Sequence, residues 1–255
     1  MYTLLICLLA GMGAGLGTGF AGMSAAAVIS PMLITFLNMP AYQAVGVALA
    51  SDVLASAASA FTYYRNKNLD VRNGLIMMAA VLAMTMVGSW ASSLMPNSTM
   101  GSFSTVMTLL LGVKFLVRPV MTTRQTMEGV SRARRAVQSL ISGALVGFIC
   151  GFVGAGGGMM MLLVLTSVLG SELKTAVGTS VFIMAFTALT GAASHFAIGG
   201  VPDPAVLALC VVFTLLFAQL GARLANRAPA RTLNRVVGVI LVILGGAILL
   251  VNLLA

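Results

Sequence analysis

Charged side chains are scarce in this chain, and their scarcity excludes a water-soluble globular domain. Asp, Glu, Lys and Arg together make up 7% of its 255 residues, whereas a soluble domain carries roughly 25%. The three cysteines, Cys7, Cys150 and Cys210, lie apart within apolar segments, without the paired spacing of a disulfide framework or a metal site. We therefore expect no cofactor and no bound metal ion.

Long apolar segments take the place of the missing charge. Hydrophobic residues make up 60% of the chain, and its mean hydropathy is +1.07. Blocks of about 20 apolar residues recur from end to end, each long enough to cross a hydrocarbon core of ~30 Å. The pattern predicts an all-α polytopic protein of the cell membrane. Its expected apolar segments are residues 1–38, 41–64, 73–95, 100–121, 136–170, 173–198, 205–224 and 236–255.

Two of these segments are too long for a single crossing and are interrupted by glycine. Residues 143–159 read GALVGFICGFVGAGGGM, and the first segment contains GMGAGLGTGFAGMSAAA. Runs of glycine break a helix, and non-helical backbone survives in a bilayer only where it is buried in protein or lines a cavity. We therefore predict that both segments are broken, re-entrant helical hairpins.

The chain also contains an internal repeat. A shift of 132 residues, without a gap, places Gly11, Gly15, Gly19, Phe20 and Gly22 on Gly143, Gly147, Gly151, Phe152 and Gly154. The same shift places the AVG triplet at 44–46 on that at 176–178. The predicted organisation is a first transmembrane repeat, a basic cytoplasmic linker and a second transmembrane repeat, at residues 1–121, 122–135 and 136–255.

The distribution of positive charge predicts the topology. The net charge of +9 does not indicate nucleic-acid binding, because the basic residues lie in a few loops, as on the cytoplasmic side of membrane proteins. If residues 136–170 form a hairpin that enters and leaves on one side, every Lys and Arg becomes cytoplasmic. The repeat makes residues 1–38 a hairpin as well. Each half then has one hairpin and three transmembrane helices, the halves are inverted copies, and both termini lie outside.

These features resemble the TauE/SafE family of membrane permeases, the sulfite exporter family. The residues that carry the resemblance are GFICGFVGAGGG with AVGTS at 176–180, and GTGFAG…SPML with AVGVA at 44–48. The similarity covers essentially the whole chain. It implies a transporter, not an enzyme, for small anions such as sulfite, organosulfonates or other small organic acids.

The helix starts that follow the two breaks form the predicted binding site. No Lys or Arg lies near the middle of a span, so an anion would be held by free backbone N–H groups and positive helix ends. Glycine lets the anion approach that backbone closely. Glycines spaced by four, such as Gly143, Gly147 and Gly151, fit close helix packing better. The predicted tip residues are Gly22, Ser24, Ala25, Gly154, Gly156, Gly157 and Gly158.

Four further polar residues are candidates inside the spans. The hydroxyls of Ser51, Thr179 and Ser180 lie on matching segments and would add donors, although Ser and Thr more often bond their own helix backbone. Asp52 lies well inside a predicted span, and intramembrane acids are functional candidates by default. We treat it as a candidate coupling residue. The structural alternative is a protonated Asp that is hydrogen-bonded between helices.

Two other functions stay open at this point. Gly22–Ala25 reads G-x-S-x, so Ser24 with His195 as its base would make a rhomboid-like intramembrane serine protease. An anion channel would share the predicted site. The expected partners are a small anionic substrate and the lipid bilayer, but no nucleic acid, and a homodimer is an open alternative.

Overall fold

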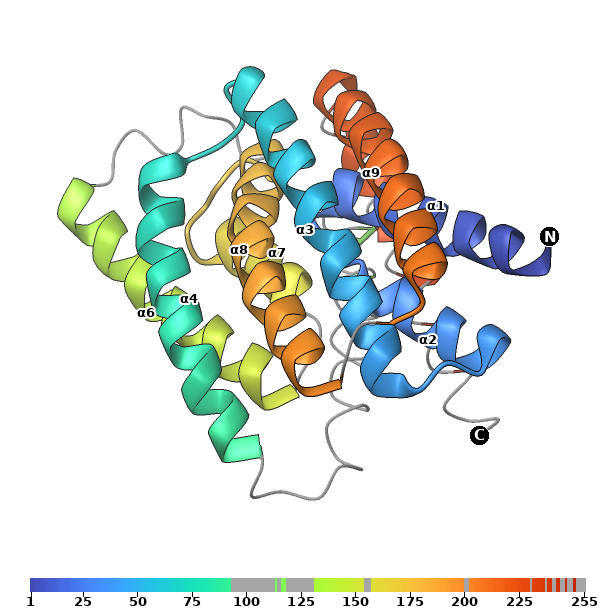
Figure 1. Ribbon diagram of the computed structural model, residues 1–255. Helices are drawn as coiled ribbons and strands as arrows, with labels where there is room; N and C mark the ends of the chain where they lie inside the picture. Colours follow the sequence, from blue (N-terminus) through green and yellow to red (C-terminus); the bar gives the residue numbers. More distant parts are fainter. Residues whose placement is uncertain are drawn as a thin grey trace.

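The protein is a bundle of helices whose arrangement is seen in a computed structural model (Figure 1). The structure describes residues 1–92, 131–153, 157–199, 202–229 and 231–236, with isolated residues at 113, at 116–117 and between 238 and 250. Within these ranges all regular structure is helical, and four helices are long and apolar enough to cross a membrane. The predicted all-α membrane fold is confirmed.

Helices follow one another in the same order in the two halves. In the first half they are α1 (Tyr2–Ala21), α2 (Ala26–Leu37), α3 (Ala41–Arg65) and α4 (Val71–Ser92). In the second half they are α6 (Arg132–Val153), α7 (Gly157–Ser167), α8 (Leu173–Gly199) and α9 (Pro204–Arg227). The predicted segments 100–121 and 236–255, and most of the linker, lie outside the residues described in continuous stretches.

Both over-long segments are broken helices. The first is divided into a long helix, α1, and a short one, α2, and the chain doubles back between them (Figure 1). The second is divided in the same way into α6 and α7. In the first segment the chain turns at Gly22, within the glycine-rich run, whereas residues 154–156 between α6 and α7 lie outside the described residues.

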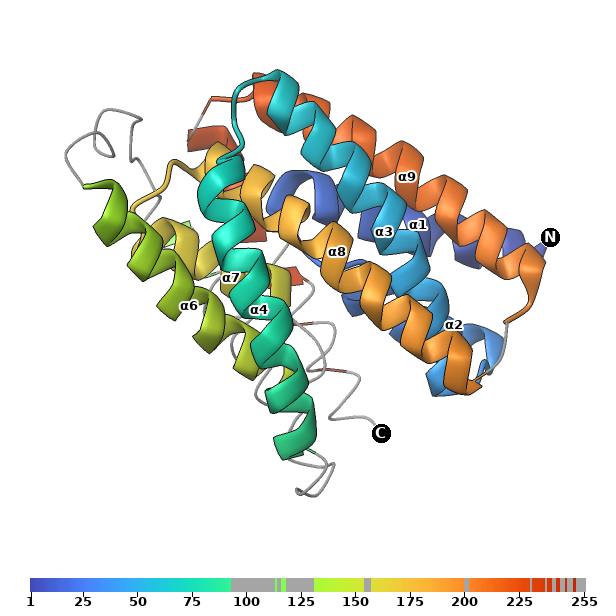
Figure 2. The same ribbon diagram turned by 60° about the vertical axis from the view of Figure 1, so that its left-hand side comes forward.

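Helices of the first half pack against helices of the second half. Helix α1 lies along α9, α6 lies along α4, and the long helices α3 and α8 run side by side between these pairs (Figure 2). Helix α2 packs against α3, and α7 packs against α8. Exchanging α1–α4 with α6–α9 leaves this set of contacts unchanged, as an internal two-fold relation requires. The opposite orientation of the two halves in the membrane stays a prediction.

Glycines with four-residue spacing allow close contact between α1 and α9 and between α6 and α4. A Cβ on Gly15 would lie 2.5 Å from the carbonyl oxygen of Thr214 on α9. A Cβ on Gly143 would lie 2.7 Å from the carbonyl oxygen of Met77 on α4. Small residues at such positions let membrane helices approach backbone to backbone. For Gly143 the packing interpretation is confirmed, and Gly147 meets the backbone of Val81 in the same way.

The AVG triplets have equivalent roles in the two halves. Gly46 on α3 lies against His195 and Phe196 of α8, and Gly178 on α8 lies against Tyr63 of α3. Tyr63 and His195 are themselves 132 residues apart, so each triplet glycine meets the corresponding turn of the other half. The packing therefore follows the register that the repeat predicts.

Candidate functional site

The tip of the first hairpin is built around Gly22. This residue ends α1 with φ +61°, a left-handed conformation that favours glycine. Its N–H donates to the carbonyl of Thr18, and the N–H of Met23 donates to the carbonyl of Gly17. The hydroxyl of Thr18 donates to the carbonyl oxygen of Met23 at 2.8 Å, which fixes the turn that follows. The helix therefore stops at Gly22 because the sequence offers a left-handed cap there.

The two tips meet. A Cβ on Gly158, in the first turn of α7, would touch the carbonyl oxygen of Gly22 and the sulfur of Met184. A Cβ on Gly22 would touch the Oγ of Ser180 on α8. Three predicted site residues, Gly22, Gly158 and Ser180, are thus brought together from both halves. Gly157 begins α7, whereas Gly154 and Gly156 lie outside the described residues.

The side chain of Asp52, on α3, lies beside the N-terminus of α2. Its Oδ2 accepts hydrogen bonds from the hydroxyl of Ser24 at 2.8 Å and from the N–H of Ala25 at 3.1 Å. Its Oδ1 accepts from the hydroxyl of Ser56 at 2.7 Å, and the side chain is 1% exposed. A carboxylate at a helix N-terminus complements the helix dipole. The N–H of Ala25 is therefore not free, contrary to the sequence-based expectation, because α3 supplies an internal acceptor.

The two half-helix starts differ in this respect. The repeat places Asp52 on Met184 and Ser56 on Ala188, so the second half has no acid at the matching position. Met184 indeed packs against the first turn of α7, as its contact with Gly158 shows. The start of α2 is neutralised within the protein, whereas the described first turn of α7 has a thioether in place of a carboxylate.

The remaining predicted hydroxyls have other partners. Ser51 donates to the carbonyl of Val47 at 2.8 Å, which is the helix-backbone bond that the sequence left as its alternative role. Ser180 donates to the carbonyl of Val177 at 2.9 Å while its oxygen lies against Gly22. Thr179 points elsewhere, and its Oγ1 accepts from the N–H of Asp70 at 3.2 Å. Sequence reasoning missed Ser56, although it lies one helical turn after Asp52.

The proposed protease pair is not assembled as a dyad would require. The single hydroxyl hydrogen of Ser24 is donated to Asp52. A serine nucleophile is activated by a base that accepts this hydrogen. His195 lies on α8 with its Cβ 3.4 Å from the position of a Cβ on Gly46. In this structure Ser24 is a partner of the carboxylate.

Comparison with known proteins agrees with this architecture. The profile of the family described as Sulfite exporter TauE/SafE matches residues 7–248. The chain belongs to the TauE/SafE family. Its relatives include the probable membrane transporter proteins YunE and YdhB of Bacillus subtilis (strain 168) and a probable membrane transporter protein of Haemophilus influenzae (strain ATCC 51907 / DSM 11121 / KW20 / Rd).

These relatives match along most of their length. YunE is 25% identical over 244 residues, which cover 91% of this chain and 89% of the relative. YdhB is 24% identical over 215 residues, covering 84% and 87%, and the H. influenzae protein is 24% identical over 255 residues, covering 92% and 94%. The chain is therefore a TauE/SafE membrane transporter.

Proposed function

We propose that this protein exports small anions such as sulfite, organosulfonates or other small organic acids, and that it binds them where the hairpin tips meet. The observation that supports this site is the difference between the two half-helix starts. Asp52 already holds the start of α2, whereas the described start of α7 has no carboxylate. An anion would take at α7 the place that Asp52 takes at α2.

The chemistry of the α7 tip suits a carrier. Its N–H groups and positive helix end attract an anion, and Gly157 presents no side chain that would keep the anion from the backbone. The hydroxyl oxygen of Ser180 lies beside the tip and would help to orient the ligand. No lysine or arginine on a described part of α1–α3 or α7–α9 is buried, so capture is dipolar and release is not opposed by a fixed cation.

The experiment is transport by variants with a filled tip. Gly157→Leu should abolish flux of labelled sulfite, sulfonate or carboxylate in proteoliposomes while the protein still reaches the membrane. The matched control is Gly17→Ala at the end of α1, where a Cβ would lie 3.5 Å from the nearest atom, in ordinary contact. Normal flux through Gly157→Leu would mean that the α7 glycines serve packing only.

A second experiment separates the transporter from the protease. Ser24→Ala removes one donor to Asp52 and leaves the α7 tip unchanged, so transport should stay measurable. Cleavage of model transmembrane substrates by the parent protein, lost in Ser24→Ala, would instead support an intramembrane protease. Channel activity would be recognised by currents that do not saturate with anion concentration.

A further inference from the structure

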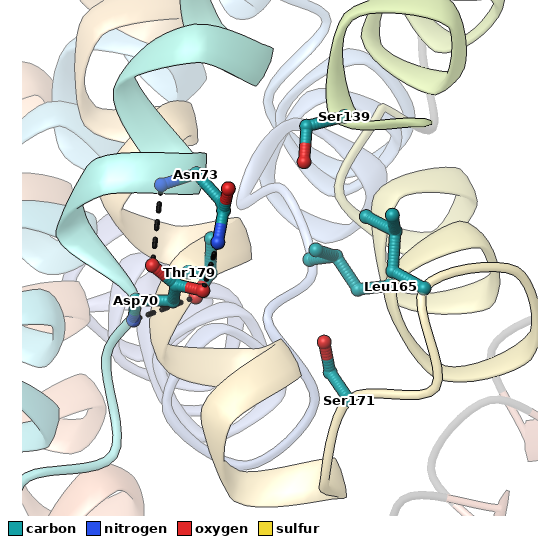
Figure 3. Close-up of a pocket in the computed structure, with 7 residues that line it drawn as sticks. Asp70, Asn73, Ser139, Leu165, Ser171 and Thr179 are labelled. Atoms are coloured by element: carbon teal, nitrogen blue, oxygen red, sulfur yellow. Dashed lines mark hydrogen bonds between the residues drawn. The ribbon is translucent and has the colours of Figure 1, made fainter. Parts of the chain in front are cut away.

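A small cavity lies away from the tips, between the start of α4, helix α6 and the connection from α7 to α8 (Figure 3). Its volume is about 10 Å³, close to that of one water-sized sphere. Five of its lining residues are polar. The complete lining is Asp70, Asn73, Ser139, Leu165, Leu169, Ser171 and Thr179.

One polar atom in this cavity has no partner. The hydroxyl of Ser139 on α6 is fully buried and makes no hydrogen bond within the described residues. It points into the cavity from one side, and the hydroxyl of Ser171 points into it from the other (Figure 3). A buried hydroxyl without a partner has lost its hydrogen bonds to water and regained none, which is unfavourable, so the structure offers a place for a ligand that would satisfy it.

The positions that correspond to the cavity lining by the 132-residue repeat, most of them in the first half, show that packing alone does not require polar residues there. The repeat puts Cys7, Leu33 and Val47 where Ser139, Leu165 and Thr179 stand, and these three are fully buried in one apolar cluster. The other cavity positions correspond to Pro202, Ala205, Leu37 and Met39. All seven corresponding positions thus have apolar residues, whereas the cavity itself has five polar residues in its lining.

The lining selects the charge of a ligand. Asp70 supplies a carboxylate whose two oxygens already accept from the N–H and the amide of Asn73, at 3.1 and 2.6 Å, and each oxygen keeps a second lone pair. The amide oxygen of Asn73 and the three hydroxyl oxygens are further acceptors. The cavity also adjoins the C-terminal end of α7, where helix carbonyls carry partial negative charge. Asp70 also caps the N-terminus of α4, whose positive end offsets part of its charge, so the preference of the lining for a hard cation over an anion rests on the carboxylate and the other oxygen acceptors together.

The size and the charge of the lining also select the kind of cation. Ca²⁺ takes 6–8 oxygen ligands, commonly with several carboxylates, and Mg²⁺ usually keeps several of its waters. A water-sized cavity with one carboxylate and otherwise neutral oxygens suits a monovalent ion without its hydration shell. In transporters, half-helix C-terminal ends are a recurring place for sodium.

We propose that this cavity binds a single sodium ion, held by Asp70, Asn73, Ser139, Ser171 and Thr179. The ion joins the first half of the chain, through α4, to the α7–α8 connection of the second half. Thr179 directly precedes Ser180, so the ion would stiffen the helix that lines the tips. The site does not depend on which anion is carried or on where that anion binds.

The test is the unfolding temperature of the purified full-length protein in detergent. It is measured in NaCl and in choline chloride at equal concentration, so that chloride is constant. Sodium should raise the midpoint of the parent protein by about 2–4 °C. Ser139→Ala should lose this shift, yet in choline chloride it should be at least as stable as the parent, because the Ser139 hydroxyl has no partner among the described residues.

Two matched controls accompany these variants. Ser30→Ala removes the other buried hydroxyl that has no partner among the described residues, on α2, and should keep the sodium shift. Asp70→Asn should lose the shift, whereas Asp203→Asn, which alters the Asp that caps α9, should keep it. If Asp70→Asn does not fold, Ser139→Ala decides alone.

Two results would overturn the proposal. Equal midpoints of the parent in the two salts would show that the cavity holds water only. A sodium shift that survives Ser139→Ala would place the ion elsewhere. Neither result involves transport, so either would leave the proposed anion export untouched.

Discussion

Asp52 takes the position at the start of α2 that an anion would take at a vacant helix end. Donors from Ser24, Ala25 and Ser56 converge on its two oxygens within 3.1 Å. A buried carboxylate that satisfies this many donors ties α2 to α3. In the proposed mechanism this leaves the α7 tip as the place where substrate binds, so one chain carries one anion.

Sequence reasoning found these residues but not all of their contacts. Asp52 was identifiable because an acid inside an apolar span is rare, and Ser24 and Ala25 because they follow a break in the helix. Their bonds to Asp52 were not predictable, because a uniformly apolar helix does not reveal which face meets which neighbour. The same holds for Thr179, whose partner Asp70 is 109 residues away.

Gly22 is the residue whose replacement tests the tip geometry. Gly22→Ala should lower the unfolding temperature for two reasons. The left-handed backbone costs about 1–2 kcal/mol for an L-residue, and the new Cβ would touch the Oγ of Ser180. Adding Ser180→Ala should recover the steric part, because the next nearest atoms to that Cβ lie 3.4 Å or more away. Thermal unfolding in detergent measures both steps.

Gly170→Ala is the matched control for that series. Gly170 has φ +62° and nothing within 4 Å of a Cβ, so its replacement carries the backbone cost alone. The double variant Gly22→Ala/Ser180→Ala should lose about as much stability as Gly170→Ala. A loss that is the same with and without the Ser180 hydroxyl would show that Ser180 does not press on the tip.

At the scale of the helices, the sequence predicted that both long segments are broken, but not which helices they pack against. The break after residue 21 follows from a glycine that caps α1, and the excess length of the segment requires the chain to turn back. The pairing of α1 with α9, and of α6 with α4, depends on backbone contact at glycines. Four-residue glycine spacing indicates the face of a helix that packs closely, but it does not identify the helix against which that face packs.

The contact between α1 and α9 provides a prediction at the scale of the helices. Gly15→Ala would place a Cβ 2.5 Å from the carbonyl oxygen of Thr214 and 2.8 Å from the N of Ala218, so the helices must separate. We expect a loss of about 1–3 kcal/mol, as for overpacked cores. Gly17→Ala, two residues later, should cost nothing, because its Cβ has room and alanine is the better helix former. Equal unfolding temperatures for the two variants would contradict backbone contact at Gly15.

At the scale of the whole molecule, the two-fold packing supports an inverted repeat whose orientation can be measured. The repeat and the basic loops predict that both termini lie outside and that the linker at 122–135 is cytoplasmic. A reporter fused after Ala255 that is active only outside the cytoplasm should therefore report activity, and the same reporter within the linker should not. A cytoplasmic C-terminus would overturn the inverted arrangement.

The proposed direction of transport rests on charge and membrane potential. A monovalent anion that leaves a cell with a negative interior gains about 2.3 kcal/mol per 100 mV, so export needs no coupled ion. An importer of the same anion must bring in more than one positive charge to be driven electrically. Among the described residues Asp52 is the charged side chain buried inside a span, and three protein donors already hold it. A single carboxylate that is already hydrogen-bonded within the protein can bind at most one proton, so it is a poor basis for coupling to several protons.

Asp52→Asn in proteoliposomes tests this reasoning. With sodium equal on both sides, anion flux through the variant should still follow an imposed voltage, at a reduced level if the tip is loosened. The amide cannot accept from all three donors, so a stability loss of about 1–3 kcal/mol is expected and is measured separately by unfolding. Asp203→Asn, at the exposed cap of α9, is the control for loss of one acid. If flux through the parent ignores voltage, follows only a pH gradient and disappears in Asp52→Asn, then Asp52 carries a coupled proton and passive efflux is the wrong mechanism.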